Sequence, residues 1–121
     1  IVSGLFYEPK AGDIICFYND YKDEVLVKRV IATAGQTVDI SDDFRVFVDG
    51  KELPEDYIGD IDTRKMSTPM PYTVEDNCVF VMGDNRGDSM DSRDMRVGTV
   101  HKNDILGRLI IRLFPRFGTV R

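Results

Sequence analysis

The amino-acid sequence predicts a single all-β domain. Short segments rich in β-branched residues recur along the chain with the two-residue period of strands, and Gly, Asp, Asn and Pro separate them. No stretch carries the period of a long amphipathic helix. A chain of 121 residues has the length of one ordinary domain. We therefore expect residues 1–121 to form one β-rich unit.

The first part of the chain contains three predicted strands. Residues 14–18 and 25–31 are apolar and rich in β-branched side chains, and the polar residues 19–23 between them predict a hairpin loop. Residues 36–40 predict a short third strand. A second hairpin is expected over residues 44–53.

This second hairpin is predicted by its turn. Apolar alternation runs into Asp49-Gly50, a pair that tolerates positive φ at both central positions of a tight turn. The two strands on either side of this pair are therefore expected to be antiparallel neighbours.

Beyond the hairpin the composition changes. Residues 54–76 are mostly charged and polar, contain three of the prolines and show no sustained period, so we expect an irregular excursion there. Residues 79–82 predict another strand. A last strand is expected over residues 108–113, with Leu and Ile alternating, and Pro115 ends it.

Charge and hydropathy exclude two roles. With 16 Lys and Arg against 21 Asp and Glu, the net charge of −5 lacks the basic surface that phosphate contacts need, so no nucleic-acid partner is predicted. The longest apolar runs, residues 14–18 and 78–82, are far shorter than the about 20 residues of a membrane-spanning helix. The chain opens at Ile1 without a charged leader, so we expect it to be a piece of a longer protein.

No metal site and no cofactor are predicted. The single histidine, His101, is expected in an exposed turn, and Cys16 and Cys78 each lie in a strand-like apolar run. One histidine and two separated cysteines do not supply a zinc ligand set. Each cysteine is expected to be a small buried thiol, and a disulfide between them stays an open alternative.

One cation in residues 25–31 has apolar neighbours on both sides. On a strand, Leu26, Lys28 and Val30 point to one face while Arg29 points to the other, so whichever face is buried takes a cation with it. Burial disfavours the charged form of a lysine, and a neutral amine is a base. The alternatives are a lysine at a strand edge that reaches water and a cation paired with an aspartate.

A polar loop over residues 83–93 follows the strand at 79–82. It combines three aspartates, two arginines, two serines and an asparagine. Such residues are common in turns, and their alternation also suggests a calcium loop, but the glutamate and the flanking helices of an EF-hand are missing. The loop could instead be a hydrogen-bonded network that holds one hydroxyl for a neighbouring strand.

Taken in order, these segments resemble the type I signal peptidases. The resemblance rests on the Gly-Asp-Ile-Ile-Cys-Phe run at 12–17, Val-Lys-Arg-Val-Ile at 27–31, Gly-Asp-Asn at 83–85 and Ser-Met-Asp-Ser-Arg at 89–93. It implies coiled antiparallel sheets of the type shared with repressor-cleavage peptidases. It also implies a membrane-anchored Ser-Lys serine endopeptidase that removes signal peptides from exported preproteins.

The resemblance also implies roles for the residues of the site. Lys28 would be the general base, and the Ser89 hydroxyl would orient it. Arg29 would pair with Asp84. The remaining implied residues are an ion pair that stiffens the loop, Asp91 with Arg93; a serine of less defined role, Ser92; and candidates for the substrate site, Leu26, Val27 and Cys16.

The nucleophile of this family is expected to lie outside the chain. It belongs to a Ser-Met-x-Pro motif, which the sequence lacks: Ser3 is followed by Gly-Leu-Phe, and Ser89-Met90 is followed by Asp91-Ser92 where x-Pro should stand. We therefore expect the chain alone to be inactive. The intact enzyme is expected at the cell membrane, with one N-terminal anchor that this chain lacks and an extracytoplasmic catalytic domain.

One departure from the family and two other functions stay open. Residues 32–36 read Ala-Thr-Ala-Gly-Gln where the family has Gly-x-Pro-Gly-Asp, with an effect that the sequence does not decide. A self-cleaving repressor-type peptidase would share the Ser-Lys pair. A module that binds extended peptides without cutting them would share the strands alone.

Overall fold

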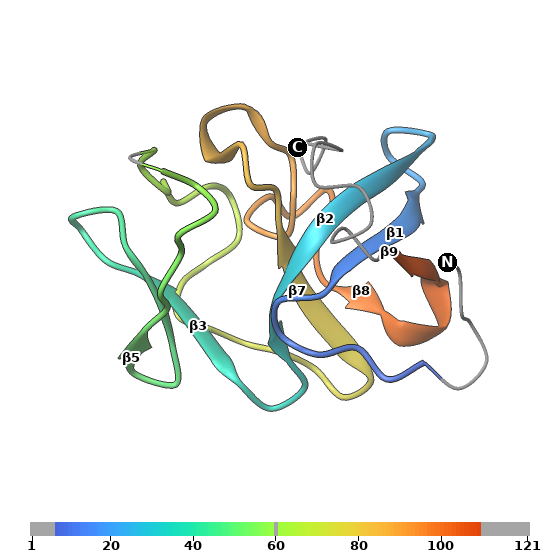
Figure 1. Ribbon diagram of the computed structural model, residues 1–121, viewed down its shortest axis with the longest axis horizontal. Coiled ribbons are helices and arrows are strands. Elements are labelled where there is room, and N and C mark those ends of the chain that lie inside the picture. Colours follow the sequence, from blue (N-terminus) through green and yellow to red (C-terminus); the bar gives the residue numbers. More distant parts are fainter. Residues whose placement is uncertain (1–6, 60, 110–121) are drawn as a thin grey trace.

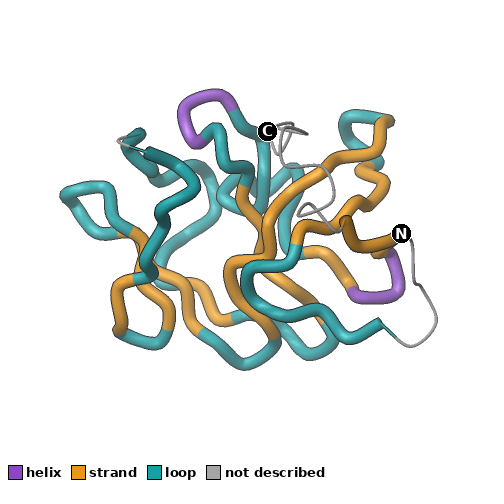
Figure 2. Tube along the Cα trace, viewed as in Figure 1, coloured by secondary structure: helices purple, strands orange, loops and turns teal. Residues whose placement is uncertain are grey.

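A computed structural model describes residues 7–59 and 61–109 of the chain, without the side chain of Leu109. Two antiparallel sheets make up the fold, and Figure 1 shows the larger sheet at the right and the smaller at the left. Strands and loops account for almost all of the coloured tube in Figure 2, and its short helical turns within the described residues are Arg86–Asp88 and Lys102–Asp104. The predicted all-β class is confirmed.

The larger sheet has five strands in the order β8-β7-β2-β1-β9. At its centre, the long strand β2 (Glu24–Thr33) pairs with β1 (Ile14–Asn19) on one side and with β7 (Cys78–Met82) on the other. The edge strands are β8 (Val100–His101) and β9 (Ile105–Leu109). The predicted strands at 14–18, 25–31 and 79–82 are thereby confirmed.

The smaller sheet has four strands in the order β5-β4-β3-β6. It contains β3 (Thr37–Ile40), β4 (Val46–Val48), β5 (Lys51–Glu52) and β6 (Tyr72–Thr73). Asp49 and Gly50 have φ of 52° and 82°, so the β4–β5 turn has the positive φ at both positions that the sequence predicts.

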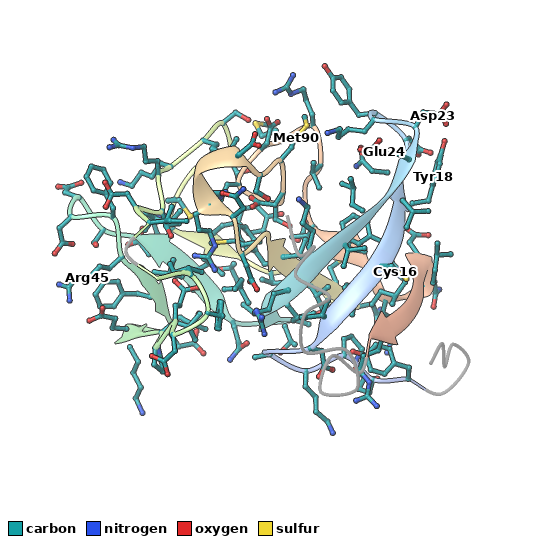
Figure 3. The ribbon with its side chains drawn as sticks, turned by 45° about the horizontal axis from the view of Figure 1, so that its top comes forward. Cys16, Tyr18, Asp23, Glu24, Arg45 and Met90 are labelled. Carbon is teal, nitrogen blue, oxygen red and sulfur yellow. The ribbon has the colours of Figure 1, made fainter. Side chains whose placement is uncertain are left out.

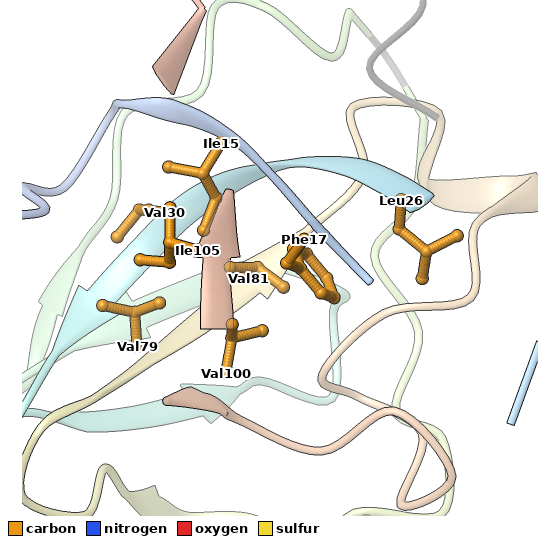
Figure 4. Close-up of a cluster of buried hydrophobic side chains, with 8 residues drawn as sticks. All are labelled: Ile15, Phe17, Leu26, Val30, Val79, Val81, Val100 and Ile105. Carbon is orange, nitrogen blue, oxygen red and sulfur yellow. The ribbon is translucent and has the colours of Figure 1, made fainter. Parts of the chain in front are cut away.

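Strand β7 separates two hydrophobic cores. Val79 and Val81 belong to the cluster drawn in Figure 4, which also contains Ile15, Phe17, Leu26, Val30, Val100 and Ile105. Phe80 and Met82, which point the other way, belong to the second cluster, with residues of β2, β3 and β4. This double burial explains why residues 78–82 are apolar without alternation.

Three expectations need correction or fall outside the described residues. His101 was expected in an exposed turn, but it lies in β8, paired with Cys78 and only partly exposed. The last strand was expected at 108–113, but β9 starts at Ile105 because it pairs with β1 from Phe17 back to Ile14. The expected residues beyond 109 lie outside the described part of the chain.

Candidate active site

The amine of Lys28 lies against the polar loop that follows β7. Lys28 is only 4% exposed, and on its face of β2 it lies between Leu26 and Val30, with Ile15 opposite on β1. Its Nζ donates a hydrogen bond of 2.8 Å to Ser89 Oγ. The structure therefore brings together two residues that are 61 positions apart in sequence, beside the aliphatic side chains of this face of β2.

On the opposite face of β2, Arg29 holds the start of the same loop. Its Nε and Nη2 donate to the two carboxylate oxygens of Asp84 at 2.9 and 2.7 Å. Burial opposes the charge of this guanidinium, but the hydrogen bonds and charge of Asp84 outweigh it and raise the pKa of Arg29 above its ordinary value. Two neighbouring residues of one strand thus contact one loop, Arg29 near its start and Lys28 near its middle.

Within the loop, Asp91 and Arg93 form a bidentate ion pair. Arg93 Nε and Nη2 each donate to an oxygen of Asp91 at 2.9 Å, and the Gly83 N–H donates to Asp91 Oδ2 at 3.0 Å. The expected pairing is present, and it joins the two ends of the loop.

Ser92 bonds to the main chain rather than to Lys28. Its hydroxyl accepts from the Val81 N–H at 2.9 Å and donates to the Gly98 carbonyl at 2.7 Å. The Ser92 N–H also donates to the Val81 carbonyl at 3.0 Å. Ser92 therefore attaches the loop to the end of β7.

A cavity of about 340 Å³ opens beside Lys28. Its described lining includes Leu26 and Val27, two of the three substrate-site candidates; its other described residues are Lys22, Glu24, Val25, Asp88 and Met90. Figure 3 shows Met90 on the loop and Glu24 near the tip of the β1–β2 hairpin.

The third substrate-site candidate, Cys16, is not among the described residues that line this cavity. It lies opposite Val27 in the β1–β2 pairing, on the face away from Lys28, with Sγ 3.7 Å from the Gly107 carbonyl oxygen. Figure 3 shows it along β1, below the hairpin tip. Cys16 and Cys78 are both free thiols, and burial raises the pKa of Cys78.

Sequence reasoning missed a second set of contacts to the loop. Arg86, inside the loop, forms a buried ion pair with Glu55 and a hydrogen bond of 2.8 Å to Thr63 Oγ1. Thr68 Oγ1 donates to the Ser92 carbonyl at 2.7 Å. Glu55, Thr63 and Thr68 of the excursion therefore contact the loop. The prolines and charges of residues 54–76 indicated an irregular segment, but no local signal gave its partner.

Within residues 7–59 and 61–109 the structure shows neither a metal-binding cluster nor a membrane-spanning helix. No cluster of three or more His, Cys, Asp or Glu side chains in this part of the chain is arranged to hold a metal ion. None of its helices has the length and apolar character that crossing a bilayer requires.

The site therefore combines a buried amine, a hydroxyl that accepts its hydrogen bond and a cavity next to both. A lysine amine in an apolar environment can accept a proton from a hydroxyl or water near neutral pH. Ser3, rejected above as a nucleophile, lies outside the described residues.

Comparison with known proteins identifies the family. The model of the family described as signal peptidase, peptidase S26, matches residues 1–114. A probable signal peptidase I-1 from Synechocystis sp. is 38% identical over 122 residues, which cover 94% of this chain and 59% of that protein. Signal peptidase I P from Bacillus subtilis subsp. natto is 36% identical over 113 residues, which cover 88% of this chain and 60% of that protein.

The fold agrees with these matches. The crystal structure of a signal peptidase I from Enterococcus faecalis superimposes with a TM-score of 0.73 and 28% identity, covering 87% of this chain and 99% of that one. The chain spans less than two thirds of the length of the two curated relatives. Since the family model covers nearly all of the sequence and the fold matches a solved member, the chain belongs to the signal peptidase family, peptidase S26.

Proposed function

We propose that the chain is the catalytic β-domain of a type I signal peptidase, a serine endopeptidase that cleaves signal peptides from exported preproteins. The observation that carries the proposal is the 2.8 Å contact between Lys28 Nζ and Ser89 Oγ, made by a lysine that is only 4% exposed. Lys28 is the general base in this proposal, and Ser89 is the residue that orients its amine.

The burial of Lys28 supports its role as a base. Removing an ammonium group from water disfavours its charged form, and a base works best when its proton affinity is matched to the operating pH. The hydrogen bond to Ser89 then fixes the direction of the nitrogen lone pair. Arg29, Asp84, Asp91, Ser92 and Arg93 support these two residues through the loop contacts described above.

The reaction needs a serine from outside the described residues. Its hydroxyl loses a proton to Lys28 as its oxygen attacks the scissile carbonyl, and Lys28 then protonates the leaving amine. Water hydrolyses the resulting acyl-enzyme, with Lys28 again as the base. The backbone N–H of that serine would contribute to the oxyanion hole.

The cavity beside Lys28 suggests where a peptide binds. In the described part of the chain, β7 pairs with β2 only from Arg29 onward, whereas β1 pairs with it from Glu24. The side of β2 between Glu24 and Lys28 that faces away from β1 can therefore pair with an extended substrate, next to Leu26 and Val27. Signal peptides of exported preproteins are the proposed partners, and the cell membrane, reached through one N-terminal anchor, is the proposed location.

Cleavage of a labelled preprotein tests the assignment. A longer polypeptide that includes the Ser-Met-x-Pro segment should cut at the signal-peptide boundary, and the 121-residue chain should not. Lys28→Met in the longer polypeptide should lower kcat/KM by about 10³-fold, the range typical of a lost general base. The matched control is Lys51→Met on the exposed strand β5, which should leave the rate unchanged.

Three results would contradict parts of the proposal. Cleavage by the 121-residue chain that Lys28→Met abolishes would place the nucleophile within these residues. Full activity of the longer Lys28→Met protein would exclude Lys28 as the base. Binding of the signal peptide without any cleavage by the longer polypeptide would favour a non-catalytic peptide-binding module.

A further inference from the structure

Arg86 connects the excursion to the loop that carries Ser89. It begins the short helix Arg86–Asp88, and Ser89 is the residue directly after this helix. The Arg86 side chain is 0% exposed and the Glu55 side chain 8%. Its guanidinium contacts both carboxylate oxygens of Glu55 and also donates to the Gly83 carbonyl at 2.8 Å. Glu55 is therefore the carboxylate that neutralises a buried cation three residues before Ser89.

Glu55 is also connected to Arg29, the residue that follows Lys28, through Tyr57. The Tyr57 hydroxyl donates to Glu55 Oε2 at 3.0 Å, and the Arg29 guanidinium lies 3.9 Å from the centre of the Tyr57 ring. Burial, together with the Glu55 carboxylate, raises the pKa of Tyr57 above its ordinary value, so the phenol stays a donor at neutral pH. Arg29 in turn follows Lys28 in β2.

These contacts form a continuous ring of neighbouring residues. Lys28 precedes Arg29 in the chain, the Arg29 guanidinium lies on the Tyr57 ring, and the Tyr57 hydroxyl binds Glu55. Glu55 binds Arg86, which lies three residues before Ser89, and Ser89 accepts the hydrogen bond of 2.8 Å from Lys28. Glu55 touches both the Arg29 side, through Tyr57, and the Ser89 side, through Arg86. A displacement of its carboxylate would loosen both sides of the Lys28–Ser89 contact together.

We infer that Glu55 is a positioning residue for the Lys28–Ser89 pair, and that the excursion around it sets the geometry of the base. The inference rests on the proposed function of Lys28. Glu55 itself does not line the described cavity, so it acts through Arg86 and Tyr57.

The excursion has other attachments, so a change at Glu55 can be tested in a folded protein. Thr68 bonds to the Ser92 carbonyl, and Arg93 Nη1 donates to the Arg64 carbonyl at 3.2 Å. Neither contact uses Glu55. Glu55→Gln keeps the size of the side chain and removes only its charge. The matched control is Glu52→Gln, which removes the carboxylate of an exposed ion pair with Arg45, a residue far from the loop in Figure 3.

The first experiment measures the Lys28 amine by NMR titration in the 121-residue chain, assigned with a Lys28→Arg variant. In the parent protein Lys28 should titrate well below the ordinary value of about 10.4. Glu55→Gln should raise this midpoint by at least ~0.5 pH units, because a looser loop lets water reach the amine. Glu52→Gln should not move it. The other titratable groups on the described cavity wall, Lys22, Glu24 and Asp88, are the same in all variants.

The possible results separate the two proposals. An ordinary midpoint in the parent would refute the proposed base, and the positioning role with it. A lowered midpoint that Glu55→Gln leaves unchanged would refute the positioning role alone. If Glu55→Gln fails to fold, Tyr57→Phe replaces it, because this variant keeps the ring on Arg29 and removes only the hydrogen bond to Glu55; an unchanged midpoint in Tyr57→Phe would then refute the inference.

The second experiment uses the longer polypeptide with its nucleophile. Glu55→Gln should lower kcat about tenfold and leave KM within a factor of two, because misplacement of a catalytic group affects the chemical step more than binding. Glu55→Asp should recover part of the rate, since it restores the charge. Equal loss in Glu55→Gln and Glu52→Gln, or a loss confined to KM, would overturn the inference.

Discussion

Asp91 and Arg93 form an ion pair from which solvent is excluded: their side chains are 0% and 1% exposed. Each partner has further contacts, since Asp91 accepts from the Gly83 N–H and Arg93 donates to the carbonyls of Arg64 and Arg86. The pair thus joins both ends of the Ser89 loop to the excursion. Loss of this ion pair should therefore act first on the stability of the fold, and on catalysis only through the fold.

Removing one member of this pair should strongly destabilise the protein. Asp91→Ala leaves a buried guanidinium without its carboxylate, and we expect the free energy of unfolding to fall by about 3 to 5 kcal/mol. Urea denaturation followed by circular dichroism measures the change. Asp62→Ala removes the carboxylate of an exposed pair with Arg64 and should cost less than ~1 kcal/mol. An equal fall in the free energy of unfolding in the two variants would show that burial does not determine the contribution of the Asp91 pair to stability.

Ser92→Ala should lower the stability of the fold without removing a contact of Lys28. The substitution leaves the buried Val81 N–H and the half-buried Gly98 carbonyl without their partner, which should cost about 1 to 3 kcal/mol. Ser41→Ala, at an exposed site where water replaces the lost bonds, should cost less. Thermal denaturation of both variants makes the comparison. A Ser92→Ala protein as stable as the parent would contradict the role of Ser92 in attaching the loop to β7.

Ser89→Ala should separate orientation from basicity. The variant keeps Lys28 buried but removes the hydroxyl that accepts its hydrogen bond, so kcat of the longer polypeptide should fall about 10- to 100-fold. Ser89→Thr keeps a hydroxyl and should retain more activity. Preprotein cleavage at saturating substrate gives kcat directly. An unchanged kcat in Ser89→Ala would remove Ser89 from the mechanism.

Asp94 should make the stability of the domain sensitive to acid. Its hydrogen bond with Arg96 lowers the pKa from 3.8 to about 2. Because the folded pKa lies below the unfolded one, the stabilisation is fully present above pH 3.8 and is lost as the pH falls towards 2. We expect about 1 to 2 kcal/mol, reduced by the solvent exposure of Arg96.

Unfolding experiments between pH 5 and 2 check this expectation. The free energy of unfolding of Asp94→Asn should vary less over this interval than that of the parent. Asp62→Asn, whose pair is exposed, should follow the parent curve. A parent and an Asp94→Asn protein with parallel curves would contradict the role of the Asp94–Arg96 pair.

The parts of the fold that the sequence predicted are those with a local signal. The strand period around Lys28 predicted which neighbours share its face, and Asp49-Gly50 predicted a turn that depends on two adjacent residues. Strands β6 and β8 were missed because two residues cannot show a period. The start of β9 is set by its pairing with β1, a tertiary contact that the sequence does not display.

The same distinction holds in the site. Lys28, Ser89 and the Asp91–Arg93 pair could be named because they lie in recognisable motifs. Glu55 could not be named, since it is 31 positions from Arg86 and lies in a segment without a period or motif. Only the folded chain shows that a glutamate in the excursion is the partner of an arginine in the loop.

Because β7 lies between two hydrophobic clusters, the Lys28–Ser89 site should unfold together with the entire domain. Because β7 contributes side chains to both hydrophobic clusters, it cannot unfold from one cluster while the other stays packed. Heating should therefore unfold both clusters in a single cooperative step. The loop over residues 83–93, which follows the last residue of β7, would lose its support in that same step. The Lys28–Ser89 contact and the folded structure should therefore disappear at one temperature, with no partly melted form that keeps this contact.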